Sequence, residues 1–379
     1  MVNEISIGMA KSGRRAWALD DVALVPSRRT RSPRDVSLDW QIDAYTFSMP
    51  VIGAPMDSVM SPATAIALGR LGGLGVLNLE GLWTRYENPE PVLEEIAHLQ
   101  AKEVSPENTR RLQEIYSEPV KAELIKARLA EIREAGVVVS GSLTPQRTQE
   151  FYQTVVDAGV DMFVIRGTTV SAEHVAQQGE PLNLKEFIYE LDVPVIVGGA
   201  AGYTPALHLM RTGAAGVLVG FGGGSATTTR RALGIRIPMA TAISDIAAAR
   251  RDYLDESGGR YVHVIADGGL GSSGDIVKAL AMGADAVMLG ATLARAEEAP
   301  GRGWHWGLEA VHPDFPRGHR TQVGTVAPLE EVLVGPGHHT DGSSNLMGGL
   351  RHAMASCGYV DLKSFQRVDV TVTPAAGSF

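Results

Sequence analysis

The chain has one cysteine, Cys357, among its 379 residues. A single thiol excludes a disulfide within the chain and argues against a cysteine-rich metal site. The ten histidines show no metal-ligand spacing either. Because this cysteine usage is typical of a reducing compartment, we expect a cytoplasmic protein. We interpret Cys357 as a small, buried apolar residue.

Long apolar runs and an excess of positive charge are also lacking. No run of about 18 apolar residues appears, so no membrane span is expected. Residues 1–20 have no apolar core of signal-peptide length. The formal net charge of -9 argues against a nucleic-acid partner. An anionic ligand would therefore depend on local donors. Hydrophobic residues make up 44% of the chain, which is enough for a full core.

Short apolar runs alternate with helical patterns between about residues 48 and 300. The runs are continuous, as expected of parallel strands buried on both faces. Strands of this kind separated by helices predict a closed (β/α)8 TIM barrel of the α/β class, with an open doubly wound sheet as the alternative. The runs are Pro50–Ala54, Leu74–Leu79, Val137–Ser140, Met162–Ile165, Val193–Val197, Gly216–Gly220, Val262–Ala266 and Ala286–Leu289.

Helix boundaries are marked by local signals. Ser61 and Pro62 form a typical helix start, and the glycines that follow the other helical patterns suit left-handed helix ends. The predicted helices are Ser61–Leu71, Gln146–Ala158, Thr204–Thr212 and Ser273–Met282.

Two segments depart from the regular alternation. Residues 89–134 are charged and helical in period, and we interpret them as two or three helices that elaborate the barrel after its second strand. Residues 301–379 are interpreted as a mobile flap and tail, with a helix near Asn345–Ser356 and a short terminal strand. Residues 1–379 are accordingly expected to form a single domain.

Three glycine-rich turns follow the last three predicted strands: Gly220–Arg230, Ala266–Leu270 and Leu289–Ala291. The carboxyl ends of barrel strands carry the ligand site, and glycine lets backbone N–H groups approach an anion. Each turn alone is more often a simple tight turn. Three on consecutive strands, with hydroxyls such as Ser225 among them, predict a phosphate site.

Two side chains near these turns have alternative interpretations. Asp267 ends a strand directly, so it could cap the helix that starts near Ser272 or grip a sugar diol. We favour the sugar, because the following glycines leave the carboxylate facing the barrel mouth. Met56 could be core filler, or it could pack on a flat base.

Together these motifs resemble the IMP dehydrogenase and GMP reductase barrels. The chain is most similar to the short IMP dehydrogenase-related subgroup, which lacks the paired regulatory (CBS) module. Residues 89–134 lie where that module would be and are too short to contain it. The motifs that carry the resemblance are Leu19–Pro26, Val51–Val59, Leu71–Gly75, Ala266–Leu270, Gly283–Gly290, Glu298–Gly301 and Met347–Arg351.

The resemblance implies a bound purine monophosphate (IMP, XMP or GMP) and, for the dehydrogenase, oxidation of IMP to XMP with NAD and water in guanine nucleotide synthesis. It also implies a monovalent cation such as K+ and a homo-tetramer or octamer. By resemblance, the nucleotide contacts are Met56, Ser225, Asp267, Gly268, Gly269, Gly290 and Ala291; the cofactor contacts are Arg166 and Gly167; and the cation contacts are Gly222, Gly224 and Thr227.

The sequence departs from the family where the chemistry occurs. The family's nucleophilic cysteine in the loop after strand six is matched by Thr227, with Thr229 beside it. A threonine hydroxyl ionises far more weakly than a thiol and needs an adjacent base. The family's aspartate after strand four is matched by Arg166, and its asparagine after strand five by Ala200.

Several functions therefore stay open. The chain could be an oxidoreductase with an altered nucleophile, a reductase acting on GMP, or a catalytically silent nucleotide-binding partner of purine enzymes. The residues themselves favour the silent protein. A barrel enzyme acting on another phosphorylated substrate is a further alternative, in which Arg166 would pair with a second anionic group.

Overall fold

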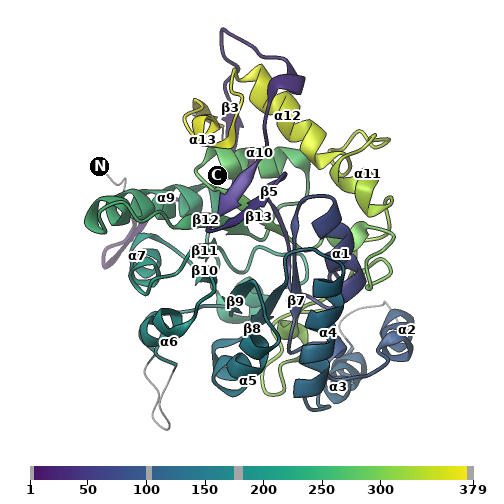
Figure 1. The fold of residues 1–379 in the computed structure, drawn as a ribbon. Helices are drawn as coiled ribbons and strands as arrows, with labels where there is room; N and C mark the ends of the chain where they lie inside the picture. The colour runs from purple at the N-terminus through teal and green to yellow at the C-terminus, as the bar shows by residue number, and fades with distance from the viewer. Residues whose placement is uncertain (1–3, 100–104, 175–181, 374–379) are drawn as a thin grey trace.

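The computed structural model describes residues 4–99, 105–174 and 182–373. Eight parallel strands form a closed barrel in which the last strand pairs with the first. The prediction of a (β/α)8 barrel is thus confirmed, and the open sheet is wrong (Figure 1). The barrel strands are β6 (Val51–Gly53), β7 (Leu74–Asn78), β8 (Ser140–Leu143), β9 (Met162–Arg166), β10 (Val195–Ala200), β11 (Gly216–Val219), β12 (His263–Asp267) and β13 (Ala286–Leu289).

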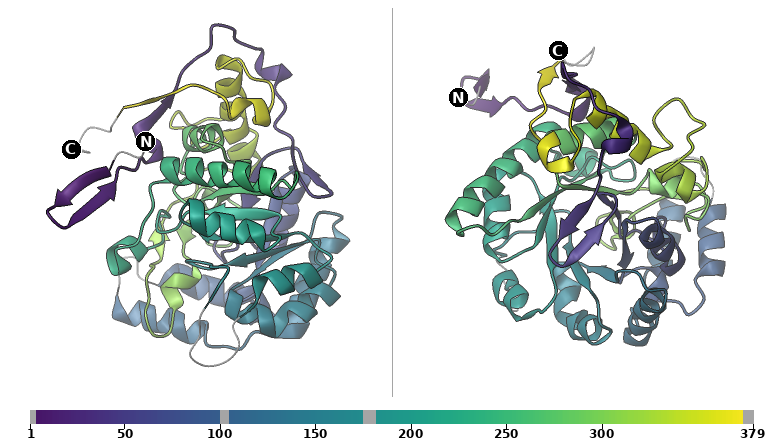
Figure 2. Two further views of the ribbon diagram at one scale, coloured as in Figure 1. Left: turned by 90° about the vertical axis from the view of Figure 1, so that its left-hand side faces the viewer. Right: turned by 45° about the horizontal axis from the view of Figure 1, so that its top comes forward.

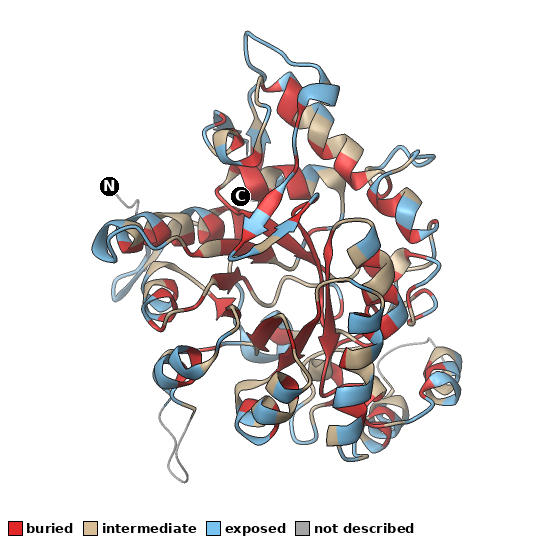
Figure 3. Cartoon of the chain, viewed as in Figure 1, coloured by how far each residue is buried: buried red, intermediate tan, exposed pale blue. Residues whose placement is uncertain are grey.

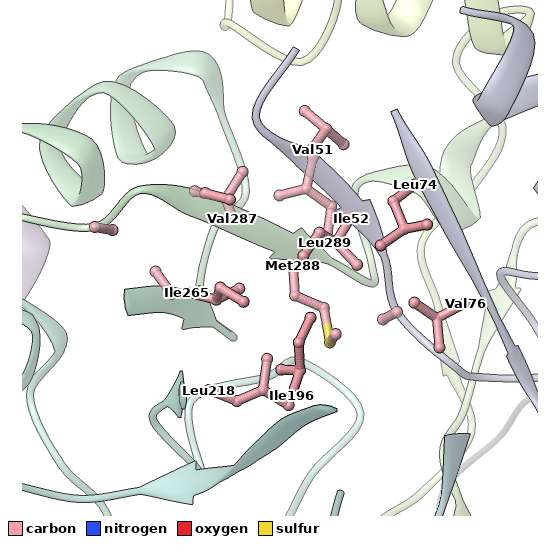
Figure 4. Close-up of a cluster of buried hydrophobic side chains, with 14 of the residues drawn as sticks. Val51, Ile52, Leu74, Val76, Ile196, Leu218, Ile265, Val287, Met288 and Leu289 are labelled. Atoms are coloured by element: carbon pink, nitrogen blue, oxygen red, sulfur yellow. The ribbon is translucent and has the colours of Figure 1, made fainter. Parts of the chain in front are cut away.

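Apolar side chains from these strands fill the barrel. Ile196, Leu218, Ile265 and Met288 gather at its centre and are buried (Figure 4). The strands are buried along nearly their whole length, whereas the surrounding helices expose one face (Figure 3). Continuous apolar runs are what strands with two covered faces require.

Helices surround the barrel at the predicted places, within about a residue. Ser61 caps the first of them, because its Oγ accepts a hydrogen bond from the N–H of Thr64 at 3.0 Å. The barrel helices are α1 (Pro62–Arg70), α4 (Ala122–Glu134), α5 (Pro145–Asp157), α6 (Leu184–Glu190), α7 (Tyr203–Arg211), α9 (Met239–Glu256) and α10 (Ser273–Ala281).

The third barrel strand was predicted too early, at Val137–Ser140, whereas β8 spans Ser140–Leu143. The apolar run Val137–Val139 precedes the strand instead of forming it, and the N–H of Val139 donates to the Asp161 carboxylate. Pairing with β7 and β9 places the small residues Ser140–Ser142 in the ladder. Tertiary pairing overrode the weak strand propensity of serine and glycine.

The segment predicted to elaborate the barrel contains α2 (Glu90–His98), α3 (Pro106–Ile115) and α4. Only α4 packs as a regular barrel helix, against α1 and α5. Helices α2 and α3 instead form a second apolar cluster with residues that follow β13. Its buried members are Leu82, Leu93, Ile96, Leu112, Ile115, Tyr116, Trp306, Ala310 and Val311. The elaboration thereby supports the C-terminal segment from outside the barrel.

The C-terminal segment crosses the mouth and then returns to the barrel's flank. The predicted helix and terminal strand are confirmed as α12 and β16, and β16 pairs with β3 (Val22–Leu24) near the N-terminus. A hairpin of β1 (Glu4–Gly8) and β2 (Lys11–Arg14) projects from the body (Figure 2). The C-terminal elements are β14 (Trp304–His305), β15 (Thr321–Gln322), α11 (Leu329–Leu333), α12 (Leu346–Ser356), α13 (Leu362–Phe365) and β16 (Val370–Val372).

Three further elements complete the fold: β4 (Trp40–Ile42), β5 (Tyr45–Phe47) and the short α8 (Thr229–Leu233). Within the described ranges, no helix combines the length and apolar character needed to cross a membrane.

Candidate functional site

The loops after five barrel strands surround one cavity of about 380 Å³ at the carboxyl ends of the strands. Its walls contain every residue singled out from the sequence for nucleotide, cofactor or cation contact, and both candidate catalytic threonines. Residues far apart in the chain meet here because parallel barrel strands end on the same side. The cavity has the size of a small-molecule site.

The glycine turns after β11 and β12 touch each other. A Cβ built on Gly223 would lie 3.9 Å from backbone atoms of Gly268 and Gly269. Gly268 has a φ of 98° and Gly269 a φ of 73°, which glycine adopts readily. A side chain on Gly222 would come within 2.8 Å of the Ile235 carbonyl. Close approach of the two turns places a backbone surface, free of side chains, on the cavity.

Asp267 is not a helix cap. Ser272 caps α10, and Asp275 completes the capping box. The Asp267 carboxylate instead accepts a hydrogen bond at Oδ2 from Nε of Arg166, at 3.0 Å. In the part of the chain that is described, its Oδ1 has no hydrogen-bond partner. One carboxylate oxygen is therefore held and the other remains available at the cavity.

Arg166 carries a half-buried positive charge into the same cavity. Burial alone would lower the pKa of Arg166, but the carboxylates of Asp267 and Glu309 raise it, so the guanidinium stays charged. An ion pair between Arg166 and the ribose-binding candidate Asp267 was not foreseen from the sequence.

Among the described residues, the Thr227 hydroxyl contacts another hydroxyl, a backbone N–H and a carbonyl. Its Oγ1 lies 2.8 Å from Oγ1 of Thr229, accepts from the Thr229 N–H, and contacts the Arg317 carbonyl at 3.4 Å. Among the described residues, no titratable side chain hydrogen-bonds this hydroxyl. The arrangement holds Thr227 in place and offers it no base.

The C-terminal segment closes against this loop. The Thr228 N–H donates to the Arg317 carbonyl at 2.7 Å, and the His319 N–H donates to the Ala226 carbonyl at 2.9 Å. The Arg317 guanidinium also donates to Oγ1 of Thr168, in the loop after β9, at 3.2 Å. The segment predicted to be a flap thus bridges two loops of the mouth.

A histidine of this segment, His305, also lines the cavity, although no sequence signal marked it. Its side chain is buried, and Nδ1 lies 3.0 Å from Oγ of Ser58. Burial, together with the nearby Arg166 charge, lowers the pKa of His305 to about 4. The imidazole is therefore neutral at physiological pH.

A buried polar network lies beside this histidine. The Tyr116 hydroxyl donates to Oδ2 of Asp57 at 2.7 Å and accepts from Nε1 of Trp306 at 2.8 Å. Burial raises the pKa of Asp57 to about 6, against the lowering effect of the Tyr116 hydrogen bond. The network ties the loop after β6 to the C-terminal segment.

The depressed pKa of His305 predicts a loss of stability in acid. Between pH 6.5 and about 4, the histidine is protonated in the unfolded chain but stays neutral in the folded protein. Protonation therefore favours the unfolded state, and the free energy of unfolding decreases as the pH falls through this window. The shift corresponds to about 3 kcal/mol. His305→Gln should remove this contribution, as chemical unfolding at pH 7 and pH 4 will measure.

Asp57 changes the stability in the opposite direction. Its pKa is raised in the folded state, so the folded protein binds this proton at a higher pH than the unfolded chain and is stabilised as the pH falls. Its contribution cancels in the difference between the native chain and His305→Gln. Parallel pH profiles of the two proteins would contradict the prediction.

Cys357 is buried away from the cavity, as its interpretation as an apolar residue requires. Within residues 4–99, 105–174 and 182–373, no group of three or more His, Cys, Asp or Glu side chains could hold a metal ion.

The fold and the cavity define a class: a (β/α)8 barrel whose ligand cavity is built from glycine turns after its last strands. The chain belongs to the IMP dehydrogenase / GMP reductase family, whose domain model matches residues 16–307. The family predicted from the motifs is thus confirmed.

Known relatives agree with this assignment. An uncharacterized oxidoreductase of Mycolicibacterium smegmatis is 55% identical over 97% of this chain and 99% of its own length. The inosine-5'-monophosphate dehydrogenase of Cryptosporidium parvum is 31% identical over 76% of this chain and 70% of its own length. A crystal structure of an IMP dehydrogenase/GMP reductase-like protein from Corynebacterium glutamicum superimposes with a TM-score of 0.92, at 49% identity and 98% coverage of both chains.

Proposed function

We propose that this chain binds a purine nucleoside 5'-monophosphate at the barrel mouth. The observation that carries the proposal is the meeting of three glycine turns and Ser225 around a single cavity that also contains Asp267 and Met56. Backbone amides in such turns bind a phosphate dianion without help from the global charge, which is negative here.

Each part of the nucleotide has a proposed partner. Ser225 and the turns at Gly268, Gly269, Gly290 and Ala291 hold the phosphate. The free oxygen of Asp267 accepts from a ribose hydroxyl, while Arg166 holds the other oxygen. Met56 packs on the base.

We further propose that the chain does not form a covalent intermediate at the position of the family's cysteine. Thr227, hydrogen-bonded to Thr229, has no base to ionise it. A nucleotide-binding partner of purine enzymes fits these residues better than an IMP dehydrogenase or a GMP reductase.

The residues do not fit NAD well. Arg166 and Gly167 lie where the resemblance implies the nicotinamide nucleotide, yet Arg166 is a cation, as is the oxidised nicotinamide ring. No step through this cofactor is proposed. The turn at Gly222 and Gly224 fits a K+ ion better, because main-chain carbonyls suit an alkali cation. One main-chain carbonyl of this turn, that of Gly224, accepts a hydrogen bond from the Thr227 N–H.

The family resemblance also supports a homo-tetramer or octamer. The cysteine usage supports a cytoplasmic location, and residues 1–379 are proposed to form a single domain. Nothing in the charge or apolar pattern calls for a nucleic-acid or membrane partner.

Titration calorimetry with IMP, GMP and XMP tests the binding proposal, and absorbance at the NADH band in the presence of IMP and NAD tests catalysis. We expect heat with at least one nucleotide and no NADH above background. An absence of heat with all three nucleotides would refute binding, and steady NADH production would refute catalytic silence.

A further inference from the structure

A separate cavity of about 480 Å³ lies on the flank of the barrel, away from the mouth. Its walls come from α9, from the end of α10 and from the C-terminal elements α13 and β16. Both α9 and α13 pack against α10 (Figure 1). Tyr261 and Gly283 line the cavity shortly before β12 and β13 begin. The cavity therefore lies toward the amino ends of the strands, whereas the mouth lies at their carboxyl ends.

The wall of this cavity carries several positive charges. In the part of the chain that is described, no carboxylate lines it, and its cationic side chains are Arg250, Arg251, Lys363 and Arg367. Nη1 of Arg250 donates to Oδ2 of the buried Asp285 at 2.5 Å. No described acid forms an ion pair with the other three cations. This local excess of positive charge lies on a chain whose formal net charge is -9.

Asp285 is too fully engaged to neutralise a second cation. Its Oδ1 accepts from the Tyr261 hydroxyl at 2.6 Å and from Nε2 of Gln366 at 3.1 Å. Its Oδ2 accepts from Arg250 and from the Val264 N–H. The same hydrogen bonds fix Tyr261 and Arg250 in place, so the floor of the cavity is formed before any ligand binds.

Lys363 is held on this floor next to like charges. Its Nζ donates to the Tyr261 hydroxyl at 2.5 Å and lies 3.8 Å from the centre of the ring. Partial burial lowers the pKa of Lys363, and the charges of Arg250 and Arg367 lower it further, against the opposing effect of Asp285. An ammonium group has three donors, and the described structure occupies one of them. An anion in the cavity would relieve the repulsion and use the remaining donors.

We propose that this cavity binds a condensed phosphate group, a diphosphate or a longer chain, independently of the nucleotide at the mouth. Several cations around one cavity suit an anion with several charges, and guanidinium groups donate paired hydrogen bonds to phosphate oxygens. Apolar side chains such as Leu254, Met282 and Val370 complete the wall. Inorganic pyrophosphate and an organic diphosphate share the required chemistry.

Titration calorimetry with pyrophosphate tests the site. The native chain should bind pyrophosphate at least about tenfold more tightly than sulfate at equal ionic strength. Arg251→Gln combined with Arg367→Gln should weaken pyrophosphate binding at least about tenfold. Both side chains are exposed and have no ion pair among the described residues, so the fold should survive their loss.

A matched control separates a local site from the overall charge of the protein. Arg70→Gln combined with Arg110→Gln removes two exposed guanidinium groups on α1 and α3, outside the cavity. This variant has the same net charge as the Arg251 and Arg367 variant and should bind pyrophosphate as the native chain does.

Isopentyl diphosphate distinguishes the two sources of the ligand. Tighter binding of this ester than of pyrophosphate would assign an organic diphosphate that uses the apolar wall, and equal or weaker binding would assign the inorganic anion. The inference would be overturned if neither compound bound more tightly than sulfate.

Pyrophosphate affinity that persists in the Arg251 and Arg367 variant would also overturn the inference, because the anion would then bind elsewhere, as at the glycine turns of the mouth. Titration of the same variant with GMP, IMP and XMP tests the mouth separately. Any nucleotide binding seen in the native chain should be unchanged in this variant. Failure of nucleotide binding and failure of pyrophosphate binding are therefore distinguishable.

Discussion

Asp267→Ala is expected to abolish the thermal stabilisation that a purine monophosphate gives the native chain. A ligand present at 100 times its dissociation constant stabilises the folded state by about 2.7 kcal/mol. Asp267 supplies the only carboxylate at the ends of β11, β12 and β13 in the described cavity wall. Without it, the ribose hydroxyls lose a charged acceptor, worth more than a neutral one. Thermal unfolding with and without GMP or IMP measures the loss.

The ion pair with Arg166 complicates this variant, because the guanidinium would lose its direct partner. With the side chain of Arg166 a quarter exposed, solvent softens that penalty. The double variant Arg166→Gln with Asp267→Ala removes the cation as well and controls for folding. Both variants should lack nucleotide stabilisation, whereas Arg166→Gln alone should retain it. A full nucleotide shift in Asp267→Ala would disprove the ribose assignment.

The barrel was predictable because its signals are local and repeated. Continuous apolar runs, a Ser61 cap and glycine helix ends each depend on a few neighbouring residues. The misplaced third strand shows the limit of such signals. Ser140–Ser142 belong to the sheet because they pair with β7 and β9, and the residue types in this segment do not themselves predict a strand.

The residues that line the cavity were predictable from the sequence only where the barrel topology itself brings them together. Turns after consecutive strands must meet, so glycine patterns near Gly222 and Gly268 sufficed. Contacts between unrelated segments gave no such signal. Arg166 and Asp267 are 101 positions apart, and Ser58 and His305 are 247 apart. Arg166 and Asp267 are the last residues of β9 and β12, whereas the Ser58–His305 contact depends on how the C-terminal segment folds over the mouth.

The same contacts explain why the missing cysteine is not an isolated change. Where the family has a nucleophile, Thr227 is held by Thr229 and by the Arg317 carbonyl. At the family's aspartate position, Arg166 pairs with the ribose candidate Asp267. Both departures replace a reactive or cofactor-facing group with one engaged inside the protein. Both support the proposal that the chain retains a nucleotide without turning it over.

Thr227→Cys should create a nucleotide-protected thiol where the native chain has none. The one native cysteine, Cys357, is buried, and burial raises the pKa of its thiol, so it should react slowly with iodoacetamide. Position 227 is half-buried in the cavity wall. Its thiol should be alkylated, and a bound purine monophosphate should block the reagent. Mass spectrometry of the intact protein over time measures the rates.

At 100 times the dissociation constant, about 1% of the sites are free, so protection of up to about 100-fold is expected. Thr227→Cys combined with Asp267→Ala should lose this protection, because the nucleotide no longer binds. Ser257→Cys, at an exposed position beyond α9, should react at the same rate with or without nucleotide. If nucleotide fails to slow alkylation at position 227 while calorimetry shows binding, the ligand lies elsewhere on the molecule. The assignment of the glycine turns as its phosphate site would then be wrong.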